Sequence, residues 1–235
     1  MPLQPYYLFE FFLNLFLISL SIFVGWKIAL KYLEYKRIEF ICVGITAITI
    51  SEPWWTFPIN SFLLFLGGTI LPTPLTQLIG FVGIPVGIFT WIYAITELMY
   101  DKRKKMIVSV SAIYLFSSEL FYIPTIVLDI DYTANFGLSL ILNVYFISFM
   151  LIVLITGLIF SRENLIAENL VNRVQGIFMI IAFLSYSVGF FYSLVGGNIL
   201  IADIIFFISA ISFYFGFALP DRIKRYIRKE ENVEM

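Results

Sequence analysis

The chain has 235 residues, of which 60% are hydrophobic and 13% are charged, and its net charge is −1 at pH 7. Soluble domains are about 45–50% apolar and about 25% charged, so this composition excludes an ordinary soluble globular protein. It also lacks the clustered positive charge of a nucleic-acid-binding protein. Cys42 is the one cysteine of the sequence, which excludes an intrachain disulfide, and we interpret it as an inert apolar residue.

Long apolar runs, separated by short charged or turn-forming segments, predict an all-α polytopic membrane protein. A spanning helix needs about 20 predominantly apolar residues. The sequence offers seven such runs, at residues 7–30, 38–57, 75–99, 106–128, 135–160, 175–195 and 199–219. We therefore expect a bundle of seven transmembrane helices in one domain at 1–220, followed by a tail at 221–235.

The segment 58–74 is the ambiguous part of this pattern. Residues 62–71 read FLLFLGGTIL, which is apolar but would reach only about 15 Å as a helix. Irregular backbone cannot face lipid, so we expect an outer loop that includes an interfacial or re-entrant segment. Prolines at 53, 85 and 124 are expected to bend their helices.

The distribution of basic residues predicts the orientation. Cytoplasmic loops collect Lys and Arg, and the seven-helix arrangement places all 15 basic residues of the chain on one side. Asp129 and Asp131 fall on the other side. The first helix has no Lys or Arg before it and meets Lys27 and Lys31 at its far end, which is typical of an uncleaved N-out helix. The sequence therefore predicts a multi-pass protein of the cell membrane, N-out and C-in.

Two segments on the predicted inner side have an amphipathic pattern. Residues 161–174 read SRENLIAENLVNRV, with Ser161 placed as an N-cap, and predict a short surface helix. The tail has a basic start and an acidic end. For both we expect anchoring to anionic lipid, with docking of a cytoplasmic signalling partner as the alternative. The basic residues that would form this face are Arg162, Arg173, Arg222, Lys224 and Arg225.

Carboxyl groups within the predicted helices are the candidates for chemistry, because a charge in the hydrocarbon core costs about 2.5–3.5 kcal/mol on insertion scales. Glu39 and Glu97 lie near the inner ends, beside basic residues, and are expected to form interfacial ion pairs. Glu10 lies near the outer end of its helix. Glu52, Glu119 and Asp203 fall in the outer half, where the arrangement places no basic partner.

These last three carboxyls predict an outward-facing polar cavity between the helices at 38–57, 106–128 and 199–219. It would bind a cation, a proton or a polar ligand, with Trp54, Trp55 and Tyr122 as wall residues. The alternative is that the carboxyls are neutral and hold helices together. We favour binding for Glu119, the deepest of the three, and a structural role for Glu52 and Asp203.

The absence of histidine excludes most membrane enzymes. Zinc hydrolases, rhomboid-type serine proteases and haem-binding bundles use histidine as a ligand or base. An aspartyl intramembrane protease needs two core aspartates, which the predicted helices do not provide. An opsin needs a lysine in its last helix, and this chain has none there. We therefore expect a protein that is not an enzyme and that binds neither a cofactor nor a metal. A sugar transporter built from two three-helix repeats would carry matching prolines in both halves, which are also missing.

The layout of helices, the segment RVQG at 173–176 before an apolar run, and the basic tail after Pro220 resemble prokaryotic, including archaeal, multi-pass proteins similar to the membrane sensor region of seven-helix histidine kinases. This resemblance implies a sensor-like or receptor-like module. Because no kinase domain follows in the sequence, its signal would pass to a separate partner. The alternatives from other classes are a small proton- or cation-coupled transporter or channel, and a structural subunit of a membrane complex.

Overall fold

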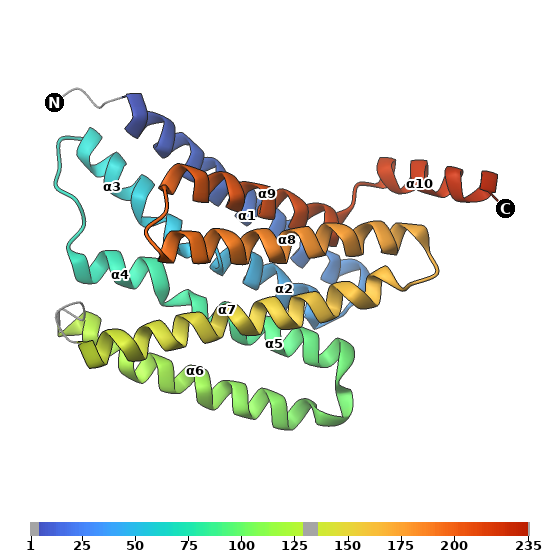
Figure 1. Cartoon of the computed structure of the whole chain (residues 1–235), viewed down its shortest axis with the longest axis horizontal. Coiled ribbons are helices and arrows are strands. Elements are labelled where there is room, and N and C mark those ends of the chain that lie inside the picture. Colours follow the sequence, from blue (N-terminus) through green and yellow to red (C-terminus); the bar gives the residue numbers. More distant parts are fainter. Residues whose placement is uncertain (1–4, 129–135, 235) are drawn as a thin grey trace. The chain divides into compact units, whose positions relative to one another are not determined.

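The computed structural model describes residues 5–128 and 136–234, and all regular elements within them are helical (Figure 1). The α-helices are α1 (Pro5–Tyr35), α2 (Ile38–Thr49), α3 (Thr56–Phe65), α4 (Thr73–Phe81), α5 (Gly83–Met99), α6 (Lys104–Val127), α7 (Phe136–Leu165), α8 (Leu170–Leu194), α9 (Ile199–Ala218) and α10 (Asp221–Glu234). Two 3₁₀ turns, η1 (Glu52–Trp54) and η2 (Asp101–Arg103), join them. The predicted acidic loop with Asp129 and Asp131, and the predicted helix start at Asn135, lie outside the described residues.

Six helical segments of the described chain are long and apolar enough to cross a membrane, and a seventh is added if the bent pair α2–α3 counts as one span. Many large apolar side chains on these helices are exposed, among them Phe12, Ile113 and Val127. Such a surface is incompatible with water over large areas. The prediction of an all-α protein with several membrane-compatible helices is confirmed.

The prediction of one continuous helix at 38–57 is wrong for the second half of this range. The α2 helix ends at Thr49, and the chain passes through η1 into α3 with a bend of 50°. Pro53 causes this break, because it has no N–H to donate to the carbonyl of Thr49. The predicted loop at 58–74 is correspondingly shorter, because α3 continues to Phe65 and α4 starts at Thr73.

The connection between α3 and α4 has two local anchors. Gly67 has φ +78°, a left-handed conformation that glycine adopts without strain, and it ends α3. The side-chain oxygen of Asn60 accepts a hydrogen bond from the backbone N–H of Leu71 at 2.8 Å. This bond ties the end of the connection back to α3.

The surface helix predicted at 161–174 is also wrong. The helix α7 continues through this segment to Leu165, and α8 begins at Leu170. Ser161 is fully buried within α7 and donates to the carbonyl of Gly157, so it is not an N-cap. Asn169 caps α8 instead, since its side chain accepts from the N–H of Val171 at 2.8 Å.

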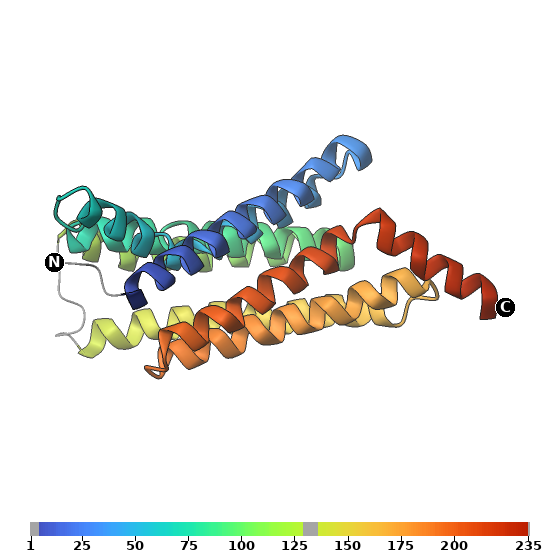
Figure 2. The same cartoon turned by 90° about the horizontal axis from the view of Figure 1, so that it is seen from above.

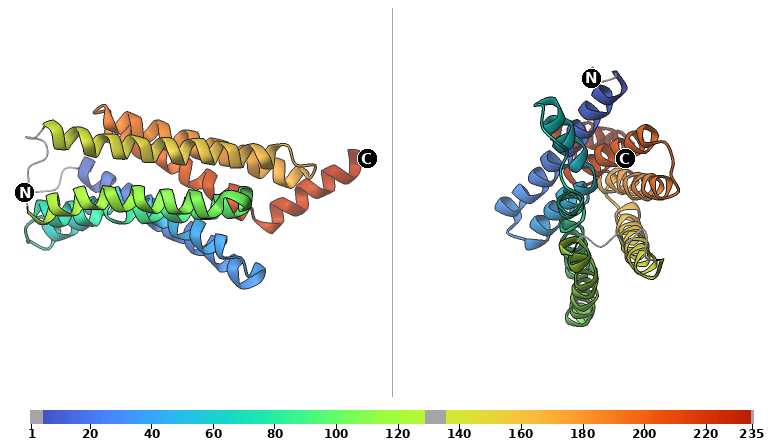
Figure 3. Two further views of the ribbon diagram at one scale, coloured as in Figure 1. Left: turned by 90° about the horizontal axis from the view of Figure 1, so that it is seen from below. Right: turned by 90° about the vertical axis from the view of Figure 1, so that its left-hand side faces the viewer.

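The chain forms two compact units, which we describe separately: unit 1 at residues 1–151 and unit 2 at 152–235. In unit 1, α1 and α2 form a hairpin, drawn in blue (Figure 3). Gly25 and Gly44 let the two helices meet, because a Cβ on either would come within 2.6 Å of the other's carbonyl oxygen. On its other side α2 contacts α5, where the hydroxyl of Thr46 donates to the carbonyl of Gly87 at 2.9 Å.

Unit 2 is built on the pairing of α8 with α9. The Ser209 hydroxyl donates to the carbonyl of Ala182 at 2.8 Å, and the side-chain amide of Gln175 donates to that of Gly216 at 3.0 Å. Figure 2 shows α10 leaving the end of α9 at a sharp angle. Its residue Ile227 packs against Val171 of α8, so the tail is a helix docked on this unit.

Candidate functional site

A buried carboxyl without a hydrogen-bond partner lies in the middle of α6. Both carboxyl oxygens of Glu119 are hidden from solvent, and neither is hydrogen-bonded to the described residues. The carboxyl borders a cavity of about 20 Å³, and about 10–15 Å³ is enough to hold one water molecule. We call it the Glu119 cavity; its other lining residues are Phe81, Pro85, Ser118, Tyr122, Tyr145, Phe146 and Phe149.

Aromatic rings form the wall of the Glu119 cavity on the side of α4. The ring centroid of Phe81 is 6.0 Å from that of Tyr122 and 5.3 Å from that of Phe146. Such aromatic pairs contribute about 0.5–1.5 kcal/mol beyond the area they bury. Tyr122 also donates its hydroxyl to the carbonyl of Gln77 at 3.4 Å. The rings around the carboxyl are therefore held by contacts among α4, α6 and α7.

Hydroxyl pairs join α6 to α7 on the other side of the cavity. Ser117 and Tyr145 are hydrogen-bonded through their oxygens at 3.1 Å, and Tyr114 is bonded to Ser148 in the same way. Each bond satisfies two hydroxyls that would be costly to bury alone. Tyr145, a lining residue, is thereby fixed beside the cavity while its hydroxyl is already in use.

This arrangement suits a small, singly charged guest. A lone carboxyl can hold a proton, a water molecule or a monovalent cation, and aromatic faces add attraction for a cation. Ca²⁺ and Mg²⁺ take six or more oxygen ligands, and no group of three or more His, Cys, Asp or Glu able to hold a metal occurs among the described residues.

Glu52 has the opposite environment. It lies in η1 with 9% of its surface exposed, and its carboxylate accepts a hydrogen bond from the backbone N–H of Gly83 at 2.7 Å. Gly83 is the first residue of α5, where N–H groups have no partner in their own helix. The carboxylate also faces the positive end of the helix dipole. Glu52 is thus a cap supplied by another part of the chain.

The break that creates this N-terminus follows from Pro85. A proline ring clashes with the carbonyl four residues earlier, here that of Phe81, and it lacks an N–H. The helix is interrupted at Val82 and restarts at Gly83, which puts Pro85 in the first turn of α5, where its missing N–H costs nothing. A Cβ on Gly83 would overlap the carboxylate of Glu52, so this close approach requires glycine.

The structure brings only part of the predicted site together. Glu119 and Tyr122 line the same cavity, whereas Glu52 is not among its lining residues. Trp54 and Trp55 are not among the lining residues; Trp55 donates from its ring nitrogen to the hydroxyl of Ser51 at 3.0 Å. The Glu119 cavity is formed by α4, α5, α6 and α7.

The remaining carboxyls in apolar helices are buried in other places. Asp203 is 1% exposed in α9 and belongs to unit 2, whereas Glu10 is 3% exposed in α1 and belongs to unit 1. The side-chain amide of Asn14 donates to the backbone carbonyl of Glu10 at 3.0 Å. Sequence reasoning missed Tyr145, Phe146 and Phe149 as wall residues. Their spacing along one face of α7 is a signal, but it does not reveal which helix they face.

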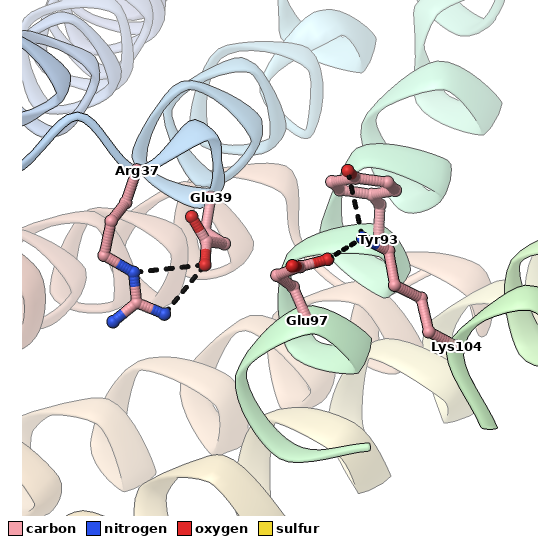
Figure 4. A network of polar contacts seen from close by, with 5 residues as sticks. All are labelled: Arg37, Glu39, Tyr93, Glu97 and Lys104. Carbon is pink, nitrogen blue, oxygen red and sulfur yellow. Dashed lines mark hydrogen bonds and ion pairs between the residues drawn. The ribbon is translucent and has the colours of Figure 1, made fainter. Parts of the chain in front are cut away.

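Two ion pairs lie where α2 begins and where α5 ends and α6 begins (Figure 4). Arg37 donates to the carboxylate of Glu39 at 2.7 Å, and Lys104 pairs with Glu97. The Lys104 ammonium also lies 4.8 Å from the ring centroid of Tyr93. The predicted ion pairs of Glu39 and Glu97 are confirmed, so neither carboxyl is left for binding a guest.

The predicted basic face lies on unit 2. Arg162 near the end of α7 and Arg173 in the first turn of α8 are exposed, as are Arg222 and Arg225 of α10. Lys224 differs from these, because it is partly buried and pairs with Asp221 at 3.4 Å.

Comparison with known proteins supplies no relative from which a function could be inferred for this site. No family model, no curated protein and no solved structure matches the chain.

Proposed function

We propose that the chain crosses the cell membrane seven times, N-out and C-in, with α2 and α3 forming one broken span. This count is supported by the length and apolar composition of the bent pair α2–α3, which are sufficient for one membrane span when the two helices are taken together. It is supported also by the basic residues, which the arrangement collects on one side.

Single cysteines test this orientation. In a Cys42→Ser background, Val195→Cys lies in the predicted outer turn between α8 and α9, and Lys105→Cys lies at the predicted inner end of α6; both native residues are exposed. A membrane-impermeant maleimide should label Val195→Cys in intact cells and Lys105→Cys only after lysis. Labelling of Lys105→Cys in intact cells would refute the proposal.

Within this topology we propose a sensor-like module without enzymatic activity, in which the Glu119 cavity takes up a proton or a monovalent cation. The single observation that carries the proposal is the unpartnered carboxyl of Glu119 in a cavity large enough for such a guest. Intramembrane ionisable groups that are left without partners are costly, and they typically mark functional sites.

The helix α7 supplies a route for a signal. Tyr145, Phe146 and Phe149 line the cavity, and the same uninterrupted helix ends at Leu165, three residues beyond the exposed Arg162. A helix of this kind transmits a shift at one end to its other end because it is stiff. We propose that the turn between α7 and α8 then contacts a separate cytoplasmic partner.

Hydrogen exchange tests the sensor proposal. The full chain, reconstituted in lipid nanodiscs, is compared at a series of pH values between 5 and 8 and at several sodium and potassium concentrations. We expect exchange at residues 160–170, corrected for its intrinsic pH dependence, to change in the wild type and to be constant in Glu119→Gln. The matched control is Glu34→Gln, the same substitution at an exposed residue of α1, which should behave as the wild type. An identical response in all three proteins would refute the proposal.

A proton- or cation-coupled transporter is the second candidate, and the interrupted helices favour it. Transporters build their sites from discontinuous helices whose N-termini and carboxylates meet near the middle of the membrane. Here the break between α4 and α5 meets Glu52, and Phe81 and Pro85 on either side of this break line the Glu119 cavity. Flux of protons or potassium into vesicles that contain the wild type, and its loss in Glu119→Gln, would establish transport. Vesicles without any flux would remove this candidate and leave the sensor.

A further inference from the structure

The helix α10 is tied to the end of the last apolar helix. Only Leu219 and Pro220 separate it from α9. Because α9 is long and apolar enough to span a membrane, the first turns of α10 lie within a few residues of the membrane boundary. This holds for either orientation of the chain.

One side of α10 is occupied by protein. Ile227 is 8% exposed and packs in a cluster with Val171 of α8 and Leu219, against which Leu170 and Phe215 also lie. Figures 1 and 2 show the middle of α10 beside the first turns of α8. This contact fixes the rotation of the helix about its own axis, and so decides which side chains face outward.

The outward side carries a basic stripe, which we define as Arg222, Arg225 and Lys229. They follow the i, i+3, i+7 spacing of one helix face, and all three are exposed. Tyr226 lies next to the stripe with 65% of its surface exposed. Tyrosine rings beside basic residues are typical of the headgroup region of a membrane.

We infer that the basic stripe of α10 binds the phosphate groups of anionic phospholipids in the leaflet that the helix adjoins. Charge complementarity supports this inference, because three outward-facing cations and an exposed tyrosine lie at the end of a span, where they meet a negatively charged surface. Each basic residue near such a surface strengthens binding by about fivefold, and the attraction decays within a Debye length, about 8–10 Å at physiological salt. Lipid binding would leave the turn between α7 and α8 free for a protein partner.

The chain offers a variant pair of equal charge to test the inference. R222Q/R225Q removes two charges from the stripe, whereas K224Q/R228Q removes two charges from the neighbouring face, where Lys224 already pairs with Asp221. The full chain is placed in nanodiscs of phosphatidylcholine alone or with 30% phosphatidylglycerol. Backbone hydrogen exchange of residues 222–229 is then measured for the wild type and both variants.

We expect phosphatidylglycerol to slow exchange by about fivefold or more in the wild type and in K224Q/R228Q, and by less than twofold in R222Q/R225Q, with the effect abolished at 1 M salt. Equal exchange in both kinds of nanodisc, or an equal loss in both variants, would overturn the inference. So would protection that inorganic phosphate produces in phosphatidylcholine alone, or protection that requires a soluble protein. None of these outcomes depends on the role of Glu119.

Discussion

Glu52 and Glu119 are both glutamates in apolar parts of unit 1, and the fold treats them in opposite ways. The carboxylate of Glu52 replaces the missing partner of the backbone N–H of Gly83 at the start of α5. The carboxyl of Glu119 has no hydrogen-bond partner among the described residues and borders a cavity. A buried polar group that satisfies others stabilises the fold, whereas one that satisfies none costs free energy. Glu52 therefore has a structural role, whereas no contact within the described residues accounts for Glu119.

The largest expected effect is that of Glu52→Ala. It leaves the N–H group of Gly83 without its acceptor, and an unpaired buried group costs about 1–3 kcal/mol. We expect the free energy of unfolding to fall by about 2–3 kcal/mol. Cys42, the single and buried cysteine, supplies the measurement, because a thiol-reactive dye labels it only on unfolding.

The control for this variant is Glu52→Gln, which keeps an acceptor oxygen but loses the charge. It should restore more than half of the stability lost in Glu52→Ala, because the hydrogen bond survives and only the interaction with the helix dipole, about 0.3–1 kcal/mol, is lost. Equal dye-labelling midpoints for Glu52→Ala and the wild type would show that the cap is unimportant.

Gly83→Ala should have an intermediate effect that depends on Glu52. The added methyl overlaps the carboxylate and displaces it, so the variant loses the 2.7 Å hydrogen bond and about 1–2 kcal/mol. In a Glu52→Ala background the same change should be neutral or stabilising, since alanine is favoured over glycine in a helix by about 0.5–1 kcal/mol. Measured by Cys42 labelling, additive effects of the two changes would contradict the proposed contact.

Much of the fold could be predicted from local sequence. The segment α4–α5 and the helices α6 and α9 begin and end within two residues of the predicted ranges, because apolar runs and their charged ends are local signals. The bend at Pro53 is visible in the sequence, but the return of the chain to helix at Thr56 is not. The prediction also failed at 161–174, where the pattern of polar and apolar residues indicated a separate surface helix that starts at Ser161. There α7 simply extends beyond its apolar part, which hydropathy does not reveal.

The site was less accessible to prediction, because its contacts join residues far apart in the sequence. Polarity within an apolar run was enough to select Glu119 and Glu52. It could not show that Glu52 meets the N–H of Gly83, 31 residues away, since this depends on how α2 packs on α5. For the same reason the walls from α7 were missed. Long-range pairing decides which carboxyl is a cap and which is left alone.

The smallest expected effect has the opposite sign and tests Glu119. Glu119→Met removes a carboxyl that has no described partner and leaves a side chain of similar length. No hydrogen bond is lost, and a buried unpaired group is removed, so we expect the free energy of unfolding to be unchanged or to rise by up to about 1 kcal/mol. Glu119→Ala is the control for volume, because it enlarges the cavity and should lower stability by about 1 kcal/mol or more. Both are read from Cys42 labelling. If Glu119→Met instead destabilised the protein as strongly as Glu52→Ala, the carboxyl would have a structural partner, and the two glutamates would no longer differ in kind. If it were stable but lost the pH or cation response, stability and function would be separated at this one residue, as expected of a group that serves function at a cost to the fold.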